Sequence, residues 1–157
     1  MKAFSLVIKK INAKLLIIGK GKLKNYLQDF ILKEDLSNYV KLIGYTKNPY
    51  NFLNCSDLFV LSSKFEGLPN VLLEAQFLKK YIISSNCPTG PKEILLNGKA
   101  GDLFRIGDYK KLAKLICDYK AKDLKIRKMI KLGFDNFYRF DLEYNCQEYH
   151  KILKHYL

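Results

Sequence analysis

Two acidic side chains, Glu66 and Glu74, flank a turn that contains a glycine and a proline. Proline suits the first position of a helix because its missing N–H is not needed there, so we predict a helix over residues 69–77. The first amides of such a helix are free to donate, and the helix dipole there favours an anion. At roughly 1.5 Å per residue, Glu74 would lie on the order of 8 Å along this helix. Two acceptors so spaced could hold hydroxyl groups at opposite ends of a sugar nucleotide, with its phosphates at the amides between them.

Each glutamate taken alone also has a simpler interpretation. Glu66 could neutralise the positive end of the helix dipole, and Glu74 could be a solvated helix residue. Gly67, which follows Glu66, would let a ligand approach the backbone closely because it carries no side chain. The two glutamates become informative only together with this turn and its surroundings.

The elements that must position this turn follow from the apolar pattern. Short aliphatic runs closed by glycine or turn residues predict parallel strands over residues 13–19, 39–43, 57–61, 81–84 and 100–104. Segments with helical spacing predict helices near residues 3–11, 23–32, 48–55, 69–77, 93–96, 108–119, 123–132 and 141–157. This alternation predicts an α/β fold with a Rossmann-like, doubly wound parallel sheet. Ligands bind such sheets at the carboxyl ends of the strands, so the candidate loops are residues 19–22, 44–48, 62–70 and 86–92.

Gly19-Lys20-Gly21 follows the first predicted strand and leads into a helix. A dinucleotide-binding fingerprint would need a further glycine at the position of Lys24. The pattern is incomplete, so a tight turn between strand and helix is the simpler interpretation. Lys20 could still add positive charge to a cleft.

The chain has a net charge of +13, from 28 Lys and Arg against 15 Asp and Glu. This excess favours anionic partners: nucleotide phosphates, nucleic acid or an anionic membrane face. The basic residues are almost all lysines, and bidentate base recognition prefers arginine, so we expect no specific nucleic-acid binding. A solvated basic surface is the simplest interpretation. We expect a cytoplasmic protein, with a peripheral position on the inner face of the membrane as an open alternative.

The residues that usually hold metals or act as general bases are sparse. Both histidines, His150 and His155, lie near the carboxyl end, and the four cysteines form no C-x-x-C pair. No Asp-x-Asp pair is present to hold a divalent ion on a nucleotide diphosphate. We therefore expect no metal, no cofactor and reduced cysteines.

Residues 65–75, Phe-Glu-Gly-Leu-Pro-Asn-Val-Leu-Leu-Glu-Ala, resemble the signature of the retaining glycosyltransferases of family 4, which have the two-domain GT-B architecture. The similarity continues through residues 44–50, 56–63 and 87–94 and extends over residues 3–120. The amino-acid sequences of these motifs most resemble those of bacterial enzymes that add hexose or N-acetylhexosamine units to lipid-linked glycans.

The resemblance implies that the chain is a donor-binding half that takes a UDP-sugar. It implies that Glu74 holds the nucleotide ribose and that Glu66, the residue assigned a catalytic role, contacts the hydroxyls of the donor sugar. It further implies backbone contacts to the sugar and phosphates around the turn, and contacts to the base from an earlier loop. The donor-binding residues expected besides Glu74 are Gly67, Leu68, Pro69, Asn70, Gly44, Tyr45, Lys64 and Gly19. Transfer would retain the anomeric configuration, with the leaving phosphate helping to deprotonate the acceptor.

The sequence departs from the family pattern in three ways. The Arg and Lys that bind the diphosphate precede the first helix in the family, and here the chain starts inside that helix. The acceptor-binding domain, with its usual histidine, is also absent, so either activity would need a separate acceptor-domain chain or the chain is a truncated gene product. The Gly and Pro that usually end the helix after the second glutamate are replaced by Lys79 and Tyr81. Two functions stay open: a glycosyltransferase half that is incomplete alone, or a non-catalytic remnant or basic binding module.

We predict a nucleotide-sugar-binding domain over residues 1–139 and an amphipathic carboxyl-terminal helix over residues 140–157. Apolar residues of this helix fall on one stripe: Leu142, Cys146, Tyr149, Leu153 and Tyr156. In the family the last helix crosses back to the other domain. Without that domain the stripe would be exposed or would fold onto the sheet, and we expect it to pack in the core.

Overall fold

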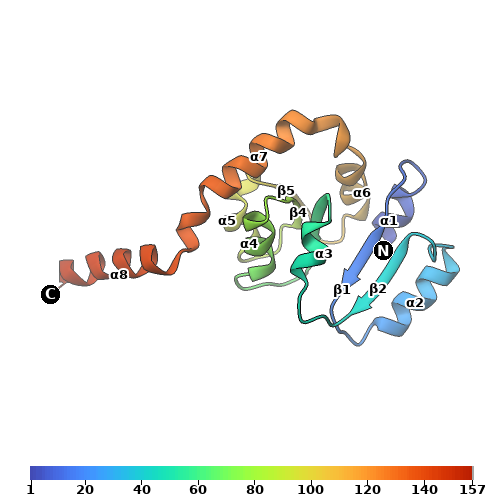
Figure 1. Cartoon of the computed structure of the whole chain (residues 1–157), viewed down its shortest axis with the longest axis horizontal. Coiled ribbons are helices and arrows are strands. Elements are labelled where there is room, and N and C mark those ends of the chain that lie inside the picture. The colour runs from blue at the N-terminus through green and yellow to red at the C-terminus, as the bar shows by residue number, and fades with distance from the viewer. Residues whose placement is uncertain (157) are drawn as a thin grey trace.

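The aliphatic runs form short strands, each followed by a helix or a turn, in a computed structural model that describes residues 1–156 (Figure 1). Leu157, to which we predicted the last helix would extend, lies outside the described residues. The strands are β1 (Leu15–Ile18), β2 (Val40–Gly44), β3 (Leu58–Leu61), β4 (Tyr81–Ser85) and β5 (Asp102–Phe104). The helices are α1 (Lys2–Val7), α2 (Lys24–Lys33), α3 (Tyr50–Asn54), α4 (Asn70–Phe77), α5 (Pro91–Ile94), α6 (Tyr109–Cys117), α7 (Asp123–Asp135) and α8 (Leu142–Tyr156).

All strand pairings are parallel, which confirms the predicted α/β class. Hydrogen bonding divides the strands into two sheets, one of β1 and β2 and one in the order β3-β4-β5. Within residues 1–156, β1 and β3 are therefore not hydrogen-bonded neighbours, although a doubly wound sheet is normally continuous.

Two apolar clusters cover the two faces of the β3-β4-β5 sheet. The larger cluster joins α1, α6 and α7 to residues of β4 such as Ile83, and the smaller one joins α4 and α5 to Ile82. Every residue of β4 is buried, because alternate side chains enter opposite clusters. This double burial explains why β4 is apolar over three consecutive residues and carries no charged side chain.

The sheet of β1 and β2 is covered less completely. Leu15 and Ile17 pack against the larger cluster, whereas Leu16 and Ile18 on the opposite face are exposed. In Figure 1 this sheet and α2 lie together at one end of the molecule.

Helix α8 projects away from the rest of the chain (Figure 1), and none of its residues from Leu142 to Tyr156 is buried. The expectation that its apolar stripe packs in the core was therefore wrong. At the start of the helix, Asp141 accepts a hydrogen bond from the Tyr144 amide at 2.9 Å, and the Asn145 side chain donates to the Arg139 carbonyl at 2.9 Å. No helix among residues 1–156 is both long enough and apolar enough to cross a bilayer.

Candidate functional site

Helix α4 begins in an open turn at the carboxyl end of β3. Pro69 precedes the helix with φ −74° and ψ 94°, so α4 starts at Asn70, one residue later than predicted. Asn70 and Val71 are exposed, and their N–H groups belong to the first turn, where helices leave amides without intrahelical acceptors. A Cβ added at Gly67 would meet nothing within 4 Å. The backbone that we expected to face a phosphate is therefore accessible.

Glu74 is half-buried on α4, and its carboxylate has a fixed partner. The Tyr50 hydroxyl donates to Glu74 Oε1 at 3.3 Å. Tyr50 is the first residue of α3, and its amide donates to the Asn48 side chain at 3.2 Å. The loop after β2 thus orients the carboxylate that follows β3, which joins two of the candidate loops.

The turn that carries Glu66 is held by the loop after β4. The Thr89 hydroxyl donates to the Glu66 carbonyl, and the Ser85 hydroxyl donates to the Ser63 carbonyl at 2.6 Å. These contacts fix the backbone of the turn, while Glu66 stays half-exposed and Lys64 exposed.

Gly90 makes the closest approach between these two loops. A Cβ at this position would lie 2.3 Å from the Gly67 carbonyl oxygen and 2.4 Å from Pro69 Cδ. Its φ of +81° is also in the left-handed region. Only glycine both adopts this φ and leaves room for the turn, so Gly90 allows the close packing of the loop after β4 against the turn.

The remaining predicted residues lie on the loops after β1 and β2. The Gly19 amide donates to the Gly44 carbonyl at 2.8 Å, and the Lys20 ammonium lies 5.0 Å from the centroid of the Tyr45 ring. The predicted site residues thus form two groups. One is on the loops after β1 and β2, the other is on the loop after β3 and α4, and the bond from Tyr50 to Glu74 connects the two.

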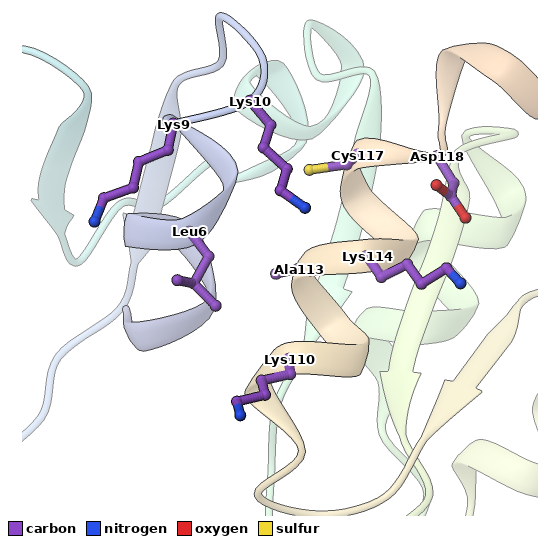
Figure 2. Close-up of a pocket in the computed structure, with 8 residues that line it drawn as sticks. All are labelled: Leu6, Lys9, Lys10, Lys110, Ala113, Lys114, Cys117 and Asp118. Carbon is purple, nitrogen blue, oxygen red and sulfur yellow. The ribbon is translucent and has the colours of Figure 1, made fainter.

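The loops after β1, β2 and β3 and the start of α4 together form the site, which we call the rim. It is open to solvent and is not an enclosed cavity. Large apolar side chains stand exposed along it, with 80% of Phe65, 51% of Leu68 and 65% of Tyr45 accessible. A hollow of about 560 Å³ lies elsewhere, between α1 and α6 (Figure 2). Its lining residues are Leu6, Lys9, Lys10, Lys110, Ala113, Lys114, Cys117 and Asp118. None of the predicted site residues borders it.

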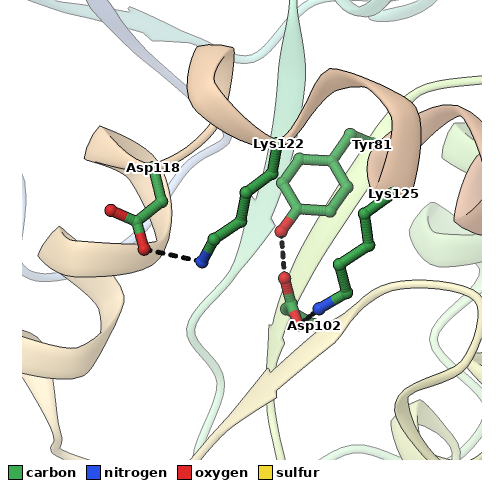
Figure 3. A network of polar contacts seen from close by, with 5 residues as sticks. All are labelled: Tyr81, Asp102, Asp118, Lys122 and Lys125. Atoms are coloured by element: carbon green, nitrogen blue, oxygen red, sulfur yellow. Dashed lines mark hydrogen bonds and ion pairs between the residues drawn. The ribbon is translucent and has the colours of Figure 1, made fainter.

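A partly buried polar network connects β4 to β5 and α7, away from the rim (Figure 3). The Tyr81 hydroxyl donates to Asp102 Oδ2, and Lys125 Nζ lies 3.5 Å from Asp102 Oδ1. Burial of the Tyr81 ring raises the pKa of its hydroxyl far above the usual value, and the Asp102 carboxylate raises it further. This network connects β4, β5 and α7 and has a structural role.

The described residues offer no set of metal ligands. Among residues 1–156 no three His, Cys, Asp or Glu side chains come together, and His150 and His155 are exposed on α8. The predicted absence of a metal stays a prediction.

The structure adds site residues that sequence reasoning did not assign: Tyr50, Ser85, Thr89 and Gly90. All four lie at or after the carboxyl end of a strand, on the same edge as the predicted residues. Their positions in the motifs at residues 44–50 and 87–94 were a signal that these loops matter, but nothing in the sequence showed which side chains meet.

Residues 1–133 match the family model described as glycosyl transferases group 1. An uncharacterized glycosyltransferase of Methanocaldococcus jannaschii is 51% identical over 96 residues, which is 60% of this chain and 24% of that protein. The capsular polysaccharide biosynthesis glycosyltransferase CapM of Staphylococcus aureus is 33% identical over 78% of this chain and 34% of its own length.

Solved structures agree with these matches. TarM of S. aureus, solved in complex with alpha-GlcNAc-glycerol and UDP, superposes with a TM-score of 0.81 at 27% identity, over 88% of this chain and 28% of that one. Another TarM structure gives a TM-score of 0.85 at 25% identity, over 96% and 30%. The chain thus spans about a quarter to a third of the length of these relatives. It has the fold of the carboxyl-terminal half of GT-B structures, and it belongs to the group 1 glycosyl transferases, family 4.

Proposed function

We propose that this chain is the donor-binding half of a retaining glycosyltransferase and that it binds a UDP-hexose or UDP-N-acetylhexosamine at the rim around α4. The observation that carries the proposal is the pair of half-buried glutamates, Glu66 and Glu74, on either side of a turn whose amides are open to solvent. The acceptor would be a polysaccharide or a lipid-linked glycan.

The names of the relatives support this substrate class. CapM acts in capsular polysaccharide biosynthesis, and a relative from Campylobacter jejuni, 31% identical over 62% of this chain, transfers N-acetylgalactosamine onto a diphospho-undecaprenol-linked glycan. The TarM structure with UDP supports uridine diphosphate as the nucleotide.

The geometry suggests a role for each group. Glu74, oriented by Tyr50, accepts hydrogen bonds from the ribose hydroxyls, and Glu66 accepts from hydroxyls of the donor sugar. The amides of Asn70 and Val71 and the ammonium of Lys64 meet the diphosphate, where the helix dipole adds to the attraction. The loops at Gly19, Gly44 and Tyr45 would contact the base.

In the proposed reaction the bond between the anomeric carbon and the β-phosphate oxygen breaks. The acceptor oxygen bonds to the same face of the sugar, and its proton passes to the leaving phosphate. Charge that develops on the sugar is stabilised by Glu66. Such catalysis needs both reactants held in one closed site, so efficient transfer also requires an acceptor-binding domain.

Titration of the protein with UDP tests the proposal. We expect Glu74→Gln to weaken UDP binding about 10- to 100-fold, because a hydrogen bond to a charged group contributes about 1.5–3 kcal/mol. Glu143→Gln, on exposed α8, is the matched control and should leave binding unchanged. A protein that binds a short RNA in a salt-sensitive manner but does not bind UDP would favour the basic binding module and overturn the proposal.

A further inference from the structure

The hollow of about 560 Å³ between α1 and α6 has no part in the proposed binding of a nucleotide sugar. Its walls are two helices that are fixed in the core. Val7 of α1 is fully buried, and Leu112 and Leu115 are buried on the side of α6 that faces away from the hollow. Figure 1 shows α1 and α6 side by side, on the side of the molecule away from the end of α8. Core packing therefore sets the shape of this hollow.

The hollow carries an excess of positive charge. Four of the residues that line it are lysines: Lys9, Lys10, Lys110 and Lys114. Within residues 1–156 none of the four pairs with a carboxylate. Asp118, the acidic residue of the lining, is instead paired with Lys122, with 2.6 Å between Asp118 Oδ2 and Lys122 Nζ. Because no side chain neutralises these lysines, the hollow attracts anions. We call it the basic hollow.

Charged and apolar groups occupy different parts of the basic hollow. Figure 2 shows Lys10 and Lys110 at opposite ends of the space between the helices, with Ala113 and the Cys117 sulfur facing this space between them. Leu6 lines the hollow from α1. The apolar groups therefore form a floor and the ammonium groups lie at its ends. This arrangement suits a molecule in which an anionic group adjoins hydrocarbon.

The residue types indicate which anion fits. Lysine binds phosphate as a point charge, whereas the planar fork of arginine suits carboxylates and the edges of bases. The lining contains four lysines and no arginine, and it contains no aromatic side chain on which a base could stack. Phosphate beside hydrocarbon is the chemistry of an anionic phospholipid.

We propose that the face formed by α1 and α6 docks on a bilayer that contains anionic phospholipid, with one lipid headgroup in the basic hollow. The phosphate would lie between Lys10 and Lys110. The glycerol and the first methylenes of the lipid would contact Leu6, Ala113 and Cys117.

The lysines on the two flanks extend the contact beyond one lipid. Figure 2 shows Lys9 and Lys114 extending outward from the two helices, where the headgroups of neighbouring lipids would lie. Each lysine near an anionic surface strengthens binding about fivefold, and this attraction acts only over short distances. None of the predicted site residues borders the basic hollow, so docking leaves the rim accessible. The inference does not depend on nucleotide binding.

Co-sedimentation of the full chain with vesicles tests the docking. The probe is vesicles of equal parts phosphatidylcholine and phosphatidylglycerol, and vesicles of phosphatidylcholine alone are the control. We expect Lys10→Gln combined with Lys110→Gln to lower the partition coefficient roughly tenfold or more. Lys128→Gln combined with Lys154→Gln, on α7 and α8, removes the same net charge and should lower it less than about twofold. All four side chains are exposed, so neither variant should unfold the protein.

The Cys117 thiol reports occupancy of the basic hollow itself. We expect anionic vesicles to slow its alkylation by iodoacetamide roughly fivefold or more, measured by mass spectrometry of its peptide, because bound lipid covers it. Neutral vesicles should have no effect. Cys146, which is exposed on α8, should react at the same rate with either vesicle. Glycerol phosphate in solution should leave Cys117 unprotected, which distinguishes a bilayer from a free phosphate.

Three results would overturn the proposal. One is an equal loss of vesicle binding by the two double variants, which would assign binding to overall charge. Another is unchanged alkylation of Cys117 on protein bound to anionic vesicles. The third is protection of Cys117 by a short RNA or by glycerol phosphate without vesicles, which would assign the hollow to another anion. Lys10→Gln with Lys110→Gln should leave UDP binding unchanged, so this inference and the proposed function can fail separately.

Discussion

The two sheets of this domain carry different parts of the same candidate site. They differ in how well packing and hydrogen bonds hold the loops that follow their strands. The β3-β4-β5 sheet is covered on both faces, and the turn at Glu66 that follows β3 is held by Ser85 at the end of β4 and by Thr89 from the loop after it. The β1-β2 sheet has an exposed face, its loops at Gly19 and Gly44 bond to each other, and the exposed bond from Tyr50 to Glu74 links this group to α4. The difference indicates that the side proposed to bind the sugar and phosphates is formed in advance, whereas the side proposed to bind the base depends on how the two sheets are joined.

Shortening one aliphatic side chain in each sheet should give the largest difference, measured as the loss in the free energy of unfolding. Ile82 of β4 is fully buried, so Ile82→Ala should lower the free energy of unfolding by about 2–5 kcal/mol. Leu16→Ala, on the exposed face of β1, should cost less than about 1 kcal/mol because little apolar area leaves the core. Urea denaturation measures both. Equal losses would show that the two sheets are equally supported.

A pair of glycine substitutions tests the contact between the loops. Gly90 and Gly44 both have positive φ, +81° and +77°, so alanine should introduce comparable backbone strain of about 1–2 kcal/mol at each position. Only at Gly90 would the new Cβ collide with the turn, at the Gly67 carbonyl. We expect Gly90→Ala to weaken UDP binding at least tenfold more than Gly44→Ala, measured by calorimetric titration. If the two variants behave alike, the loop after β4 does not hold the binding turn.

The hydroxyl of Tyr81 allows a pH-dependent test of how the β3-β4-β5 sheet is stabilised. Its pKa is raised in the folded state, so above the ordinary tyrosine value of 10.0 the unfolded chain loses this proton while the folded chain keeps it. This contribution to stability is therefore complete below pH 10.0 and is lost as the pH rises beyond it. Tyr81→Phe should cost about 1 kcal/mol at neutral pH and should weaken the decline of stability between pH 9 and pH 11. An identical alkaline decline in both proteins would contradict the assignment.

The smallest expected effect concerns the bond that connects the two groups of site residues. Tyr50→Phe removes the donor to Glu74 Oε1 and leaves the ring in place. We expect UDP binding to weaken roughly two- to fivefold, which matches the modest net contribution of one hydrogen bond, and unfolding to be unchanged. Tyr144→Phe on α8 serves as the control. A loss as large as that of Glu74→Gln would mean that Tyr50 itself contacts the nucleotide.

Local patterns predicted most elements of this fold. The aliphatic runs that became β2, β3 and β4 were identified to within one or two residues, because a strand buried between helices must be apolar throughout. The helices predicted over residues 108–119 and 141–157 begin after Asp108 and Asp141, and each of these carboxylates accepts a hydrogen bond from the amide three residues later. These features depend on neighbouring residues, which a sequence displays directly.

What the sequence did not predict depends on residues that are distant along the chain. The division into two sheets depends on which strand edges meet, and no local pattern encodes that. Thr89 and Gly90 contact the turn at residues 66–69, although they lie more than twenty positions away in the sequence. Tyr50 contacts Glu74 over a similar separation. The exposure of α8 was missed for a related reason. An apolar stripe shows that a helix face needs a partner, but it does not show whether that partner belongs to the same chain.

Helix α8 also sets a spatial scale. Its fifteen residues reach about 22 Å from the turn at Asp141, at roughly 1.5 Å of rise per residue. A protein that grips the far end of this arm, near Leu153, can therefore tether the domain without touching the rim around α4. Attachment through this arm and the proposed nucleotide binding would be spatially separate, so a change that abolishes one can leave the other intact.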